Sequence, residues 1–269
     1  MASTDVAFAG SIPAIYDRHL APFLFEPFAA EVARRAAALS PRQILETAAG
    51  TGLATAAIAR ACPNAEIVAT DVNQAMLDVA AQRIASERVS FLQADAQDLP
   101  FDDGLFDLVV CQFGVMFYPD RVKGNAEARR VLREGGRYLL VVWDRIENNP
   151  AAQLINASMR DAFPDDPPRF LERTPWGYAD PAAIEHDLIA AGFTDIEFET
   201  VATSSSHGTT IDDAAVGLTQ GSPLRAEIEQ RGDGALDRAT EFARHALRPL
   251  DGPGGFDSRL SAHFITAIR

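Results

Sequence analysis

Three acidic residues stand at or just beyond the ends of three apolar runs in this 269-residue chain: Glu46, Asp71 and Asp95. The small-residue loop 48–52 follows Glu46 and would let a ligand approach the backbone closely. Asp71 lies about 20 residues after Gly50, a separation at which a carboxylate reaches the ribose hydroxyls of a bound nucleoside. Each acid alone is equally typical of a helix cap or a solvated turn. Together with the loop, the three predict a nucleoside-binding site.

The charges around the loop bear on which nucleoside binds. Thr55 occupies the place of the third glycine in the dinucleotide fingerprint Gly-x-Gly-x-x-Gly. Glu46 directly precedes the loop, where a carboxylate would repel a pyrophosphate and attract a cation. S-adenosylmethionine has a sulfonium, an ammonium group and a ribose but no phosphate, so it fits better than a nicotinamide dinucleotide. An NAD-dependent oxidoreductase is the alternative interpretation.

Strands and helices alternate along the first two-thirds of the chain and must position these residues. An alanine-rich helix is expected over 53–61, and Asn73 is expected to cap a helix that runs to about Ile84. A further helix is expected from about Val122 to Arg133, ended by Gly135-Gly136. Strands are expected over 43–46, 66–70, 89–94, 106–111 and 137–143. This alternation predicts a parallel sheet with helices on both faces, which binds ligands beyond the carboxyl ends of its strands.

The rest of the chain continues the pattern and adds helices. A helix is expected from Asp180-Pro181 to Gly192, and strands over 195–201 and 259–268. The segment 210–250 predicts two or three helices, broken at Gly221-Ser222-Pro223 and at Gly232-Asp233-Gly234. We therefore expect one α/β domain with a helical insertion late in the chain.

Several of these motifs resemble class I S-adenosylmethionine-dependent methyltransferases, in particular the bacterial ubiquinone/menaquinone-biosynthesis branch (methyltransferase type 11). The matching motifs are Glu-x-Ala-x-Gly-x-Gly at 46–52, Asp71, Asp95-Ala96, and the segments 106–114 and 130–136. The resemblance extends over residues 12–145. It implies a Rossmann-like, doubly wound α/β fold, with a mostly parallel seven-stranded sheet whose last strand is antiparallel, plus a helical insertion or lid.

The resemblance also implies a role for each loop at the strand ends. The loop residues Glu46, Ala48, Gly50 and Gly52 would surround the methionine and ribose of the cofactor, although Ala48 replaces the first glycine of the family. Tyr16 would lie on an N-terminal helix folded over the cofactor, and it is equally well explained as an aromatic side chain that packs this helix onto the body.

The adenine end of the cofactor would meet residues that follow the second, third and fourth strands. Asp71 would hold the ribose hydroxyls, with Val72 against the adenine. Asp95 would accept a hydrogen bond from the adenine amino group, and the Ala96 N–H would reach a ring nitrogen. The two residues expected to border the sulfonium are Gln112 and Phe113.

The domain organisation follows from the same resemblance and from the order of elements. We expect a single methyltransferase domain over 1–269, with an N-terminal helical cap at 1–40 and a cofactor-binding core at 41–145. Lid or acceptor-pocket insertions are expected at 146–179 and 203–255. The aromatic residues Phe163, Phe170, Trp176 and Tyr178 lie in or beside the first insertion and would either line an apolar acceptor site or pack a lid.

No catalytic base and no metal site can be assigned from the sequence. The residue spacing that metal ligands require is absent. The histidines show no motif, and a structural or solvated role is favoured for each: His19, His186, His207, His245 and His263. The expected reaction is in-line methyl transfer to an unidentified small-molecule acceptor. A non-catalytic S-adenosylmethionine-binding protein is a further alternative.

Composition limits the partners. The net charge of −14 would repel phosphate backbones and anionic lipid heads, so neither nucleic acid nor a membrane is an expected partner. Cys62 and Cys111 are the only cysteines, and residues 1–17 have no Lys or Arg and no sustained apolar run. We therefore expect a cytoplasmic protein. Its oligomeric state is left open.

Overall fold

The structure is a computed structural model that describes residues 10–205, 208–253 and 255–269. Contacts within the chain divide it into two compact units. The sheet unit comprises Phe28–Trp143, Tyr178–Val201 and Ala262–Arg269. The helical unit comprises the described residues of Met1–Pro27, Asp144–Gly177 and Ala202–Ser261. The loops at which the sequence predicts adenine and ribose binding all belong to the sheet unit.

The main sheet has seven strands in the order β3-β2-β1-β4-β5-β9-β6. Neighbours from β3 to β5 pair in parallel, whereas β9 pairs antiparallel with β5. The strands are β1 (Gln43–Glu46), β2 (Glu66–Asp71), β3 (Val89–Gln93), β4 (Phe106–Gln112), β5 (Leu132–Trp143), β6 (Thr194–Ser204) and β9 (Arg259–Ile268). This confirms the predicted Rossmann-like, doubly wound sheet with an antiparallel last strand.

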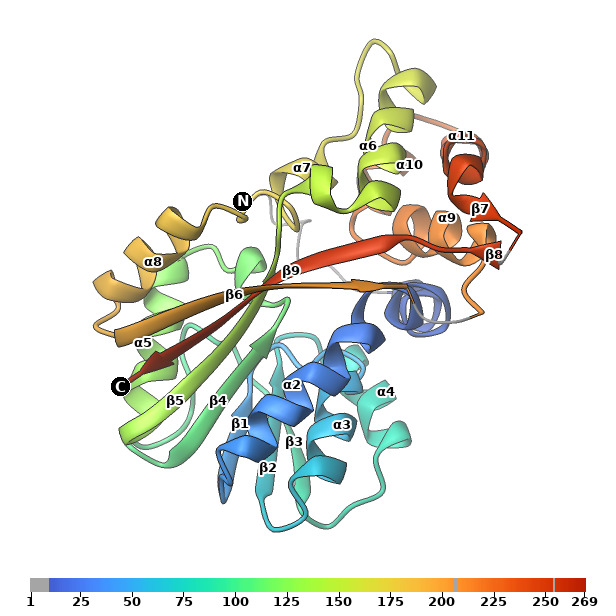
Figure 1. Cartoon of the computed structure of the whole chain (residues 1–269). Helices are drawn as coiled ribbons and strands as arrows, with labels where there is room; N and C mark the ends of the chain where they lie inside the picture. Colours follow the sequence, from blue (N-terminus) through green and yellow to red (C-terminus); the bar gives the residue numbers. More distant parts are fainter. Residues whose placement is uncertain (1–9, 206–207, 254) are drawn as a thin grey trace. The chain divides into compact units, whose positions relative to one another are not determined.

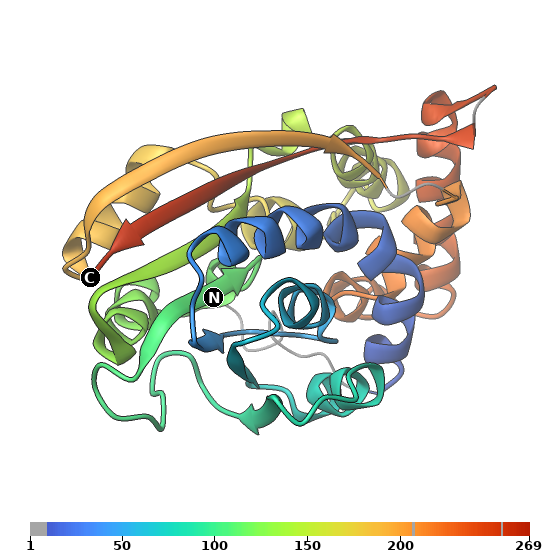
Figure 2. The same ribbon diagram turned by 60° about the horizontal axis from the view of Figure 1, so that its bottom comes forward.

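Central strands form where the sequence has unbroken apolar runs. The side chains of β4 from Leu108 to Cys111 are all fully buried, as expected for a strand covered on both faces. Three long strands, β5, β9 and β6, lie side by side toward one edge of the sheet (Figures 1 and 2). The last strand, β6, has alternating exposure, which is typical of a sheet edge.

The junction between α5 (Arg121–Val131) and β5 differs from the sequence prediction. The helix ends at Val131, and the extended conformation of Leu132 (φ −69°, ψ 142°) begins the strand. Gly135, with φ +72°, therefore lies inside β5 and does not end the helix. The pairing with β4 shifts its register between Phe106 and Leu108. The prediction that the helix ends at Gly135-Gly136 was wrong. A glycine with positive φ is found at irregularities within strands as well as at the ends of helices.

Helices cover both faces of the sheet. Figure 1 shows α2, α3 and α4 on one face, with α5 and α8 on the other. Their bounds are α2 (Glu26–Ala38), α3 (Leu53–Ala61), α4 (Gln74–Arg83), α8 (Pro181–Ala190) and the 3₁₀ turn η3 (Val115–Phe117). Phe28 of α2 is fully buried, and its ring contacts Phe113, Trp143 and Phe264 edge-on or tilted. The apolar stripe of α2 thus packs onto the sheet.

The helical unit contains most of the remaining elements. The predicted breaks are confirmed, since α9 (Ile211–Gln220), α10 (Leu224–Glu229) and α11 (Ala235–Leu247) are separate helices. The chain also forms a ten-residue π-helix, η2 (Tyr16–Phe25). The other elements are α1 (Ile12–Ile15), α6 (Pro150–Ala162), α7 (Phe170–Arg173), η4 (Ile146–Asn148), η5 (Arg248–Leu250), β7 (Asp251–Gly252) and β8 (Gly255–Phe256). Of the helices that the described residues form, none has the length and apolar character to cross a membrane.

Candidate cofactor site

The loops that follow β1, β2, β3 and β4 lie at one edge of the sheet, because parallel strands share their carboxyl ends. From β1 the chain proceeds outward to β2 and β3, then returns to the other side of β1 with β4. The strand order therefore reverses between β1 and β4. Crevices at such a reversal are where open α/β sheets bind ligands.

Glu46 is the last residue of β1 and is only 1% exposed. One of its carboxylate oxygens accepts a 2.6 Å hydrogen bond from the Thr55 hydroxyl. Burial, with a smaller effect from the charge of Asp71, raises the pKa of Glu46 to about 8, although the hydrogen bond from Thr55 lowers it. No ion pair among the described residues includes Glu46. The side chain is therefore a buried acid that is largely protonated at neutral pH until a cation approaches it.

The loop after Glu46 adopts left-handed backbone conformations. Gly50 and Gly52 have φ of +57° and +77°, and Ala48 has a φ of +53°, which is unusual for a residue with a side chain. The Thr51 hydroxyl oxygen is buried and has no hydrogen-bond partner among the residues that the structure describes. A buried, unsatisfied hydroxyl in such a loop is the kind of atom that a bound polar ligand completes.

Asp71, at the end of β2, organises the neighbouring backbone. One carboxylate oxygen accepts a 2.9 Å hydrogen bond from the Gly50 N–H, and the other accepts a 2.8 Å bond from the Asn73 N–H. Burial raises the pKa of Asp71, opposed by these hydrogen bonds. The oxygen that accepts from Gly50 keeps a lone pair for a further donor. Asn73 does not cap α4 with its side chain as predicted, because its amide is turned toward Asp71 at 3.4 Å.

The residues expected at the adenine have different environments. Val72 is 50% exposed, although it follows a buried strand. Asp95 is exposed, and one oxygen of its carboxylate accepts from the backbone N–H of Gln97 at 2.8 Å. Ala96 is half-buried beside it. An exposed valine next to a buried carboxylate suits a flat apolar ring whose attached sugar carries hydroxyl groups.

The two residues predicted at the sulfonium follow β4. Gln112 is half-buried at the end of the strand, whereas Phe113 is 5% exposed and has a φ of +56°. The Phe113 ring stacks on Trp143 with a centroid distance of 4.0 Å. Its ring thus packs in the core, and what Phe113 presents at the strand end is its backbone.

The eleventh predicted residue, Tyr16, belongs to the helical unit. It begins η2, and its ring stacks on Phe25 at 5.4 Å. The structure thus brings together in the sheet unit the predicted residues from Glu46 to Phe113, and it does not place Tyr16 with them. The aromatic residues of the first predicted insertion are also distributed over both units. Tyr178 lies in the sheet unit, where it donates to Asp187, while Phe163, Phe170 and Trp176 are buried in the helical unit.

Sequence reasoning missed two hydroxyl groups near the loop. Thr55 was noted only as a missing glycine, yet its hydroxyl holds the Glu46 carboxyl. Tyr118 is buried, and its hydroxyl donates to Thr47 at 3.2 Å, directly after β1. Thr55 is nine residues from Glu46 and Tyr118 is 71 residues from Thr47, and no sequence pattern links either pair, so neither contact was predictable. Among residues 10–205, 208–253 and 255–269, no group of three His, Cys, Asp or Glu side chains is arranged to hold a metal ion.

Comparison with known proteins identifies the segment that contains this site. Residues 44–136 match a family model described as a methyltransferase domain. A demethylmenaquinone methyltransferase of Clavibacter sepedonicus is 44% identical over 108 residues, which are 40% of this chain and 43% of that protein. The demethylmenaquinone methyltransferase of Deinococcus radiodurans is 38% identical over 139 residues, 51% of this chain and 56% of that protein. The chain thus spans about half the length of these curated relatives.

A solved structure supports the fold over a longer stretch. The crystal structure of a candidate methyltransferase from Bacillus halodurans C-125 matches with a TM-score of 0.59 and 21% identity. The match covers 89% of this chain and 97% of that one. At this identity the likeness establishes the fold and not the reaction.

Proposed function

We propose that this protein transfers a methyl group from S-adenosylmethionine to a small-molecule acceptor, because its residues 44–136 form a methyltransferase domain with the class I fold. The curated relatives are named demethylmenaquinone methyltransferases. The similarity to these two covers 40% and 51% of this chain, so the acceptor of this protein is not inferred from theirs.

The observation that carries the proposal is the pair of buried carboxyl groups at the ends of β1 and β2. Glu46 and Asp71 are 1% and 8% exposed, and burial raises the pKa of both. Neither forms an ion pair with an Arg or Lys of the described residues. A ligand that brings positive charge and hydroxyl donors satisfies both groups, whereas a pyrophosphate would add negative charge to a site that already disfavours it.

The residues present fit S-adenosylmethionine. Asp71 would accept from the ribose hydroxyls, and Val72 would lie against the adenine. The methionine portion would lie along the loop of Ala48, Gly50 and Gly52, with Glu46 beneath its charged groups. The buried Thr51 hydroxyl is available to a polar atom of the ligand. Asp95, the Ala96 N–H and Gln112 would complete the site.

The chemistry needs little from the protein beyond alignment. When bound, S-adenosylmethionine supplies a methyl carbon already activated by positive sulfur. The residues of the sheet unit would hold and orient that donor. We propose that the predicted insertions at 146–179 and 203–255 contribute to binding of the methyl acceptor.

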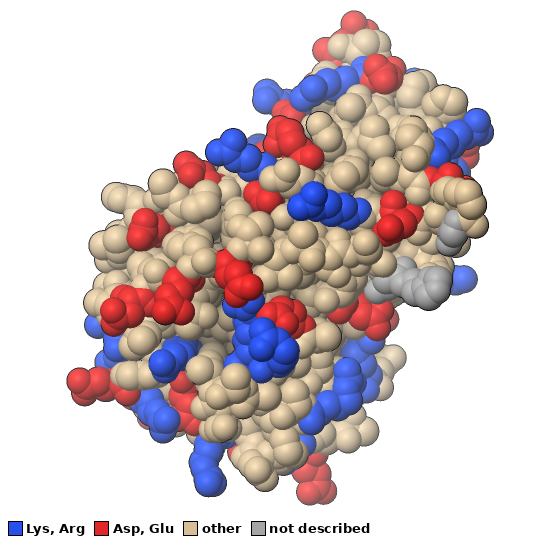
Figure 3. All heavy atoms as spheres, viewed as in Figure 1, with Lys and Arg blue, Asp and Glu red and all other residues tan. Residues whose placement is uncertain are grey.

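The proposal also covers the binding partner of the protein and its location in the cell. The net charge of −14 disfavours nucleic acid, and Figure 3 shows acidic side chains mixed with basic ones on the face that it displays. Both cysteines, Cys62 and Cys111, are free and buried. We propose a bacterial, cytoplasmic enzyme whose partner is a small molecule.

The dinucleotide alternative is disfavoured by Thr55. This residue stands where the third glycine of a dinucleotide-binding loop allows close packing, and here it is fully buried with its hydroxyl on Glu46. The loop is therefore built around a carboxyl group.

Isothermal titration calorimetry tests the proposal. Wild-type protein is titrated with S-adenosylhomocysteine and, separately, with NADH. We expect binding of the homocysteine compound and none of NADH, and a matched Asp78→Asn variant on the exposed side of α4 should bind equally well. Binding of NADH without S-adenosylhomocysteine would show that the site takes a dinucleotide.

A further inference from the structure

The hydroxyl group of Thr55 bonds a carboxyl group outside its own helix. Thr55 lies in the first turn of α3, and its side chain is fully buried. Its Oγ1 donates to Glu46 Oε2 at 2.6 Å, so the bond runs from the helix to the end of β1. Hydrogen bonds from a hydroxyl to an ionised oxygen have lengths of about 2.5–2.7 Å, shorter than most bonds between neutral groups. The length of this bond therefore suits a charged carboxylate as the acceptor.

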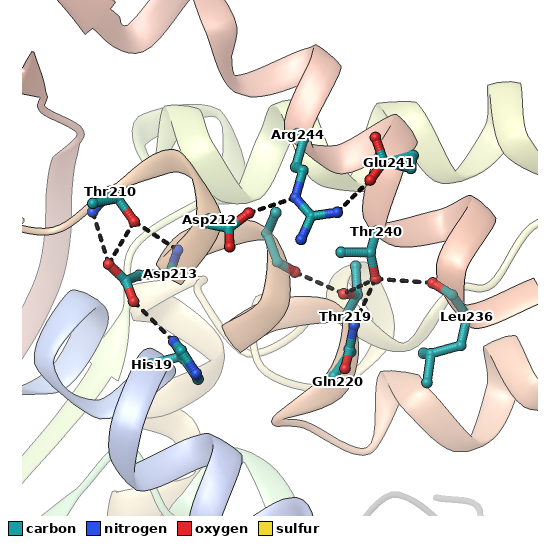
Figure 4. Close-up of polar contacts among 11 residues, drawn as sticks. His19, Thr210, Asp212, Asp213, Thr219, Gln220, Leu236, Thr240, Glu241 and Arg244 are labelled. Carbon is teal, nitrogen blue, oxygen red and sulfur yellow. Dashed lines mark hydrogen bonds and ion pairs between the residues drawn. The ribbon is translucent and has the colours of Figure 1, made fainter.

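Two other buried threonines show the more common arrangement. Thr219 of α9 and Thr240 of α11 donate to main-chain carbonyls of their own helices, four residues earlier, at 2.7 and 2.8 Å (Figure 4). Threonine hydroxyls inside helices often bond in this way. The corresponding carbonyl for Thr55 belongs to Thr51, and it accepts a 3.0 Å hydrogen bond from Arg83 Nε instead. The Thr55 hydroxyl thus serves a different element of the sheet unit.

Glu46 is fixed at its main chain as well as at its side chain. It lies opposite Ala69 of β2 and Val110 of β4 in the sheet, and its carbonyl oxygen accepts from the Thr70 hydroxyl at 3.1 Å. The sheet therefore sets the place of the residue. Of the hydrogen bonds that the described residues form, only the one from Thr55 reaches the carboxyl group. The orientation of this carboxyl group thus depends on one hydroxyl.

The same bond affects the charge of Glu46. An ionised carboxylate only accepts hydrogen bonds, so a donor held at Oε2 favours the charged form. Burial raises the pKa of Glu46, with a smaller rise from the charge of Asp71, and the bond from Thr55 opposes both. Without the hydroxyl, the carboxyl group would keep its proton more tightly when a cation approaches.

We propose that Thr55 is a positioning residue for the charged end of the cofactor: its hydroxyl holds one oxygen of Glu46, so that the other oxygen faces the ammonium group of the methionine portion. This inference rests on the proposed binding of S-adenosylmethionine. Thr55 acts through Glu46 and does not touch the ligand, because its side chain is fully buried.

A role through Glu46 distinguishes between two ligands that share the adenosine group. S-adenosylhomocysteine contains the charged amino acid portion, whereas 5′-methylthioadenosine has an uncharged methyl group on the sulfur in its place. Loss of the Thr55 hydroxyl should therefore weaken binding of the first ligand and leave binding of the second unchanged. A hydroxyl that only supported the fold of the loop would affect both ligands, since both need the ribose and adenine contacts.

The experiment uses the full chain as wild type, Thr55→Val, Thr55→Ser and Thr70→Val. Valine has the shape of threonine without the hydroxyl, and serine keeps the hydroxyl. Thr70→Val is the matched control, because it removes a buried hydroxyl that bonds the main chain of Glu46 and not its carboxyl group. Circular dichroism verifies that each variant is folded, and isothermal titration calorimetry at neutral pH measures its affinity for both ligands.

Thr55→Val should bind S-adenosylhomocysteine about 10- to 100-fold more weakly than the wild type, the range for loss of a hydrogen bond to a charged group. Its affinity for 5′-methylthioadenosine should match that of the wild type. Thr55→Ser should recover most of the lost affinity, and Thr70→Val should keep the wild-type ratio of the two affinities. An equal loss for both ligands, no loss in Thr55→Val, or no recovery in Thr55→Ser would overturn the inference. A wild type that does not bind S-adenosylhomocysteine would overturn the proposed function itself.

A double-mutant cycle gives a second measurement that needs only S-adenosylhomocysteine. If Thr55 acts through the charge of Glu46, its hydroxyl has little left to stabilise in Glu46→Gln. Thr55→Val should therefore cost much less affinity in the Glu46→Gln background than in the wild type. Thr55→Ala replaces Thr55→Val if the valine variant does not fold, with the same expected result. Losses that simply add would contradict the proposed role.

Discussion

A Cβ added at Gly114 would lie 2.5 Å from the Cβ of Ala48 and 2.9 Å from the Cys111 sulfur. The second residue after β4 and the loop after β1 therefore fit together only because Gly114 lacks a side chain. Ala48 holds a φ of +53°. The methyl group of Ala48 occupies space that a second methyl group at position 114 would require.

This relationship predicts coupling between the two positions. Gly114→Ala should lower the free energy of unfolding by about 1–3 kcal/mol through the clash. Ala48→Gly removes the opposing methyl group and relieves a left-handed conformation that costs about 1 kcal/mol, so the double variant should recover part of the loss. Urea unfolding of the four proteins measures the coupling. Strictly additive effects would show that the two residues do not compete for the same space.

The buried Glu46 predicts a pH dependence of stability. Its pKa is about 8 in the folded chain against 4.5 for the free side chain. Between these values the folded state keeps a proton that the unfolded state has released, so the stabilising contribution is present below the lower pKa and lost as pH rises to the higher one. Glu46→Gln cannot titrate and keeps an oxygen for Thr55. In the absence of ligand, the variant should therefore lose less stability than the wild type between about pH 5 and about pH 9.

Denaturant unfolding at the two pH values checks this, with Glu66→Gln as a control because Glu66 is exposed at the start of β2. Parallel pH profiles of wild type and Glu46→Gln would mean that Glu46 ionises normally. The same variant should bind S-adenosylmethionine more weakly, since it has lost the charge that faces the cation.

Asp71 should contribute strongly to cofactor affinity. Asp71→Ala removes an ionic acceptor of hydrogen bonds, which weakens binding by about 1.5–3 kcal/mol. The variant also frees the Gly50 and Asn73 N–H groups, so Asp71→Asn, which keeps the size of the side chain, helps to separate the two effects. Calorimetry with S-adenosylhomocysteine measures both. If Asp71→Ala binds S-adenosylhomocysteine as tightly as the wild type does, Asp71 does not hold the ribose hydroxyls.

Val72 should affect binding without affecting stability. Val72→Ser removes apolar surface that we assign to the adenine contact, which costs about 1 kcal/mol of binding free energy. Its side chain is 50% exposed, so the unfolding free energy should change by less than about 0.5 kcal/mol. Leu105→Ser is a matched control, because Leu105 is 48% exposed but precedes β4 at the opposite edge of the sheet. If both variants bind S-adenosylhomocysteine like the wild type, Val72 does not contact the adenine.

The sheet was predictable from the sequence because its central strands are continuous apolar runs. The strands β1 and β9 begin and end where the pattern places them, and Glu46 and Asp71 stand at strand ends as expected. What the pattern does not contain is burial of polar groups. The sequence pattern around a carboxyl group at a strand end is the same whether the group is solvated or, like Glu46, buried against Thr55.

Contacts between segments far apart in the chain could not be predicted from the sequence either. His19 Nδ1 lies 2.8 Å from a carboxylate oxygen of Asp213, 194 residues away, and the π-helix that carries His19 has no recognised sequence pattern. The histidine was expected to be structural, and its contact joins η2 to α9. His263, whose Nδ1 lies 2.9 Å from the Thr200 hydroxyl in neighbouring strands, fits that expectation, while His207 lies outside the described residues.

A crystal structure of the protein with S-adenosylhomocysteine tests the central claim most directly. The account predicts ribose hydroxyls within hydrogen-bond distance of the Asp71 carboxylate, with the adenine on Val72 and the amino acid portion above Glu46. Density for the ligand elsewhere on the chain, or an Asp71 carboxylate that contacts only Gly50 and Asn73 in the complex, would contradict it.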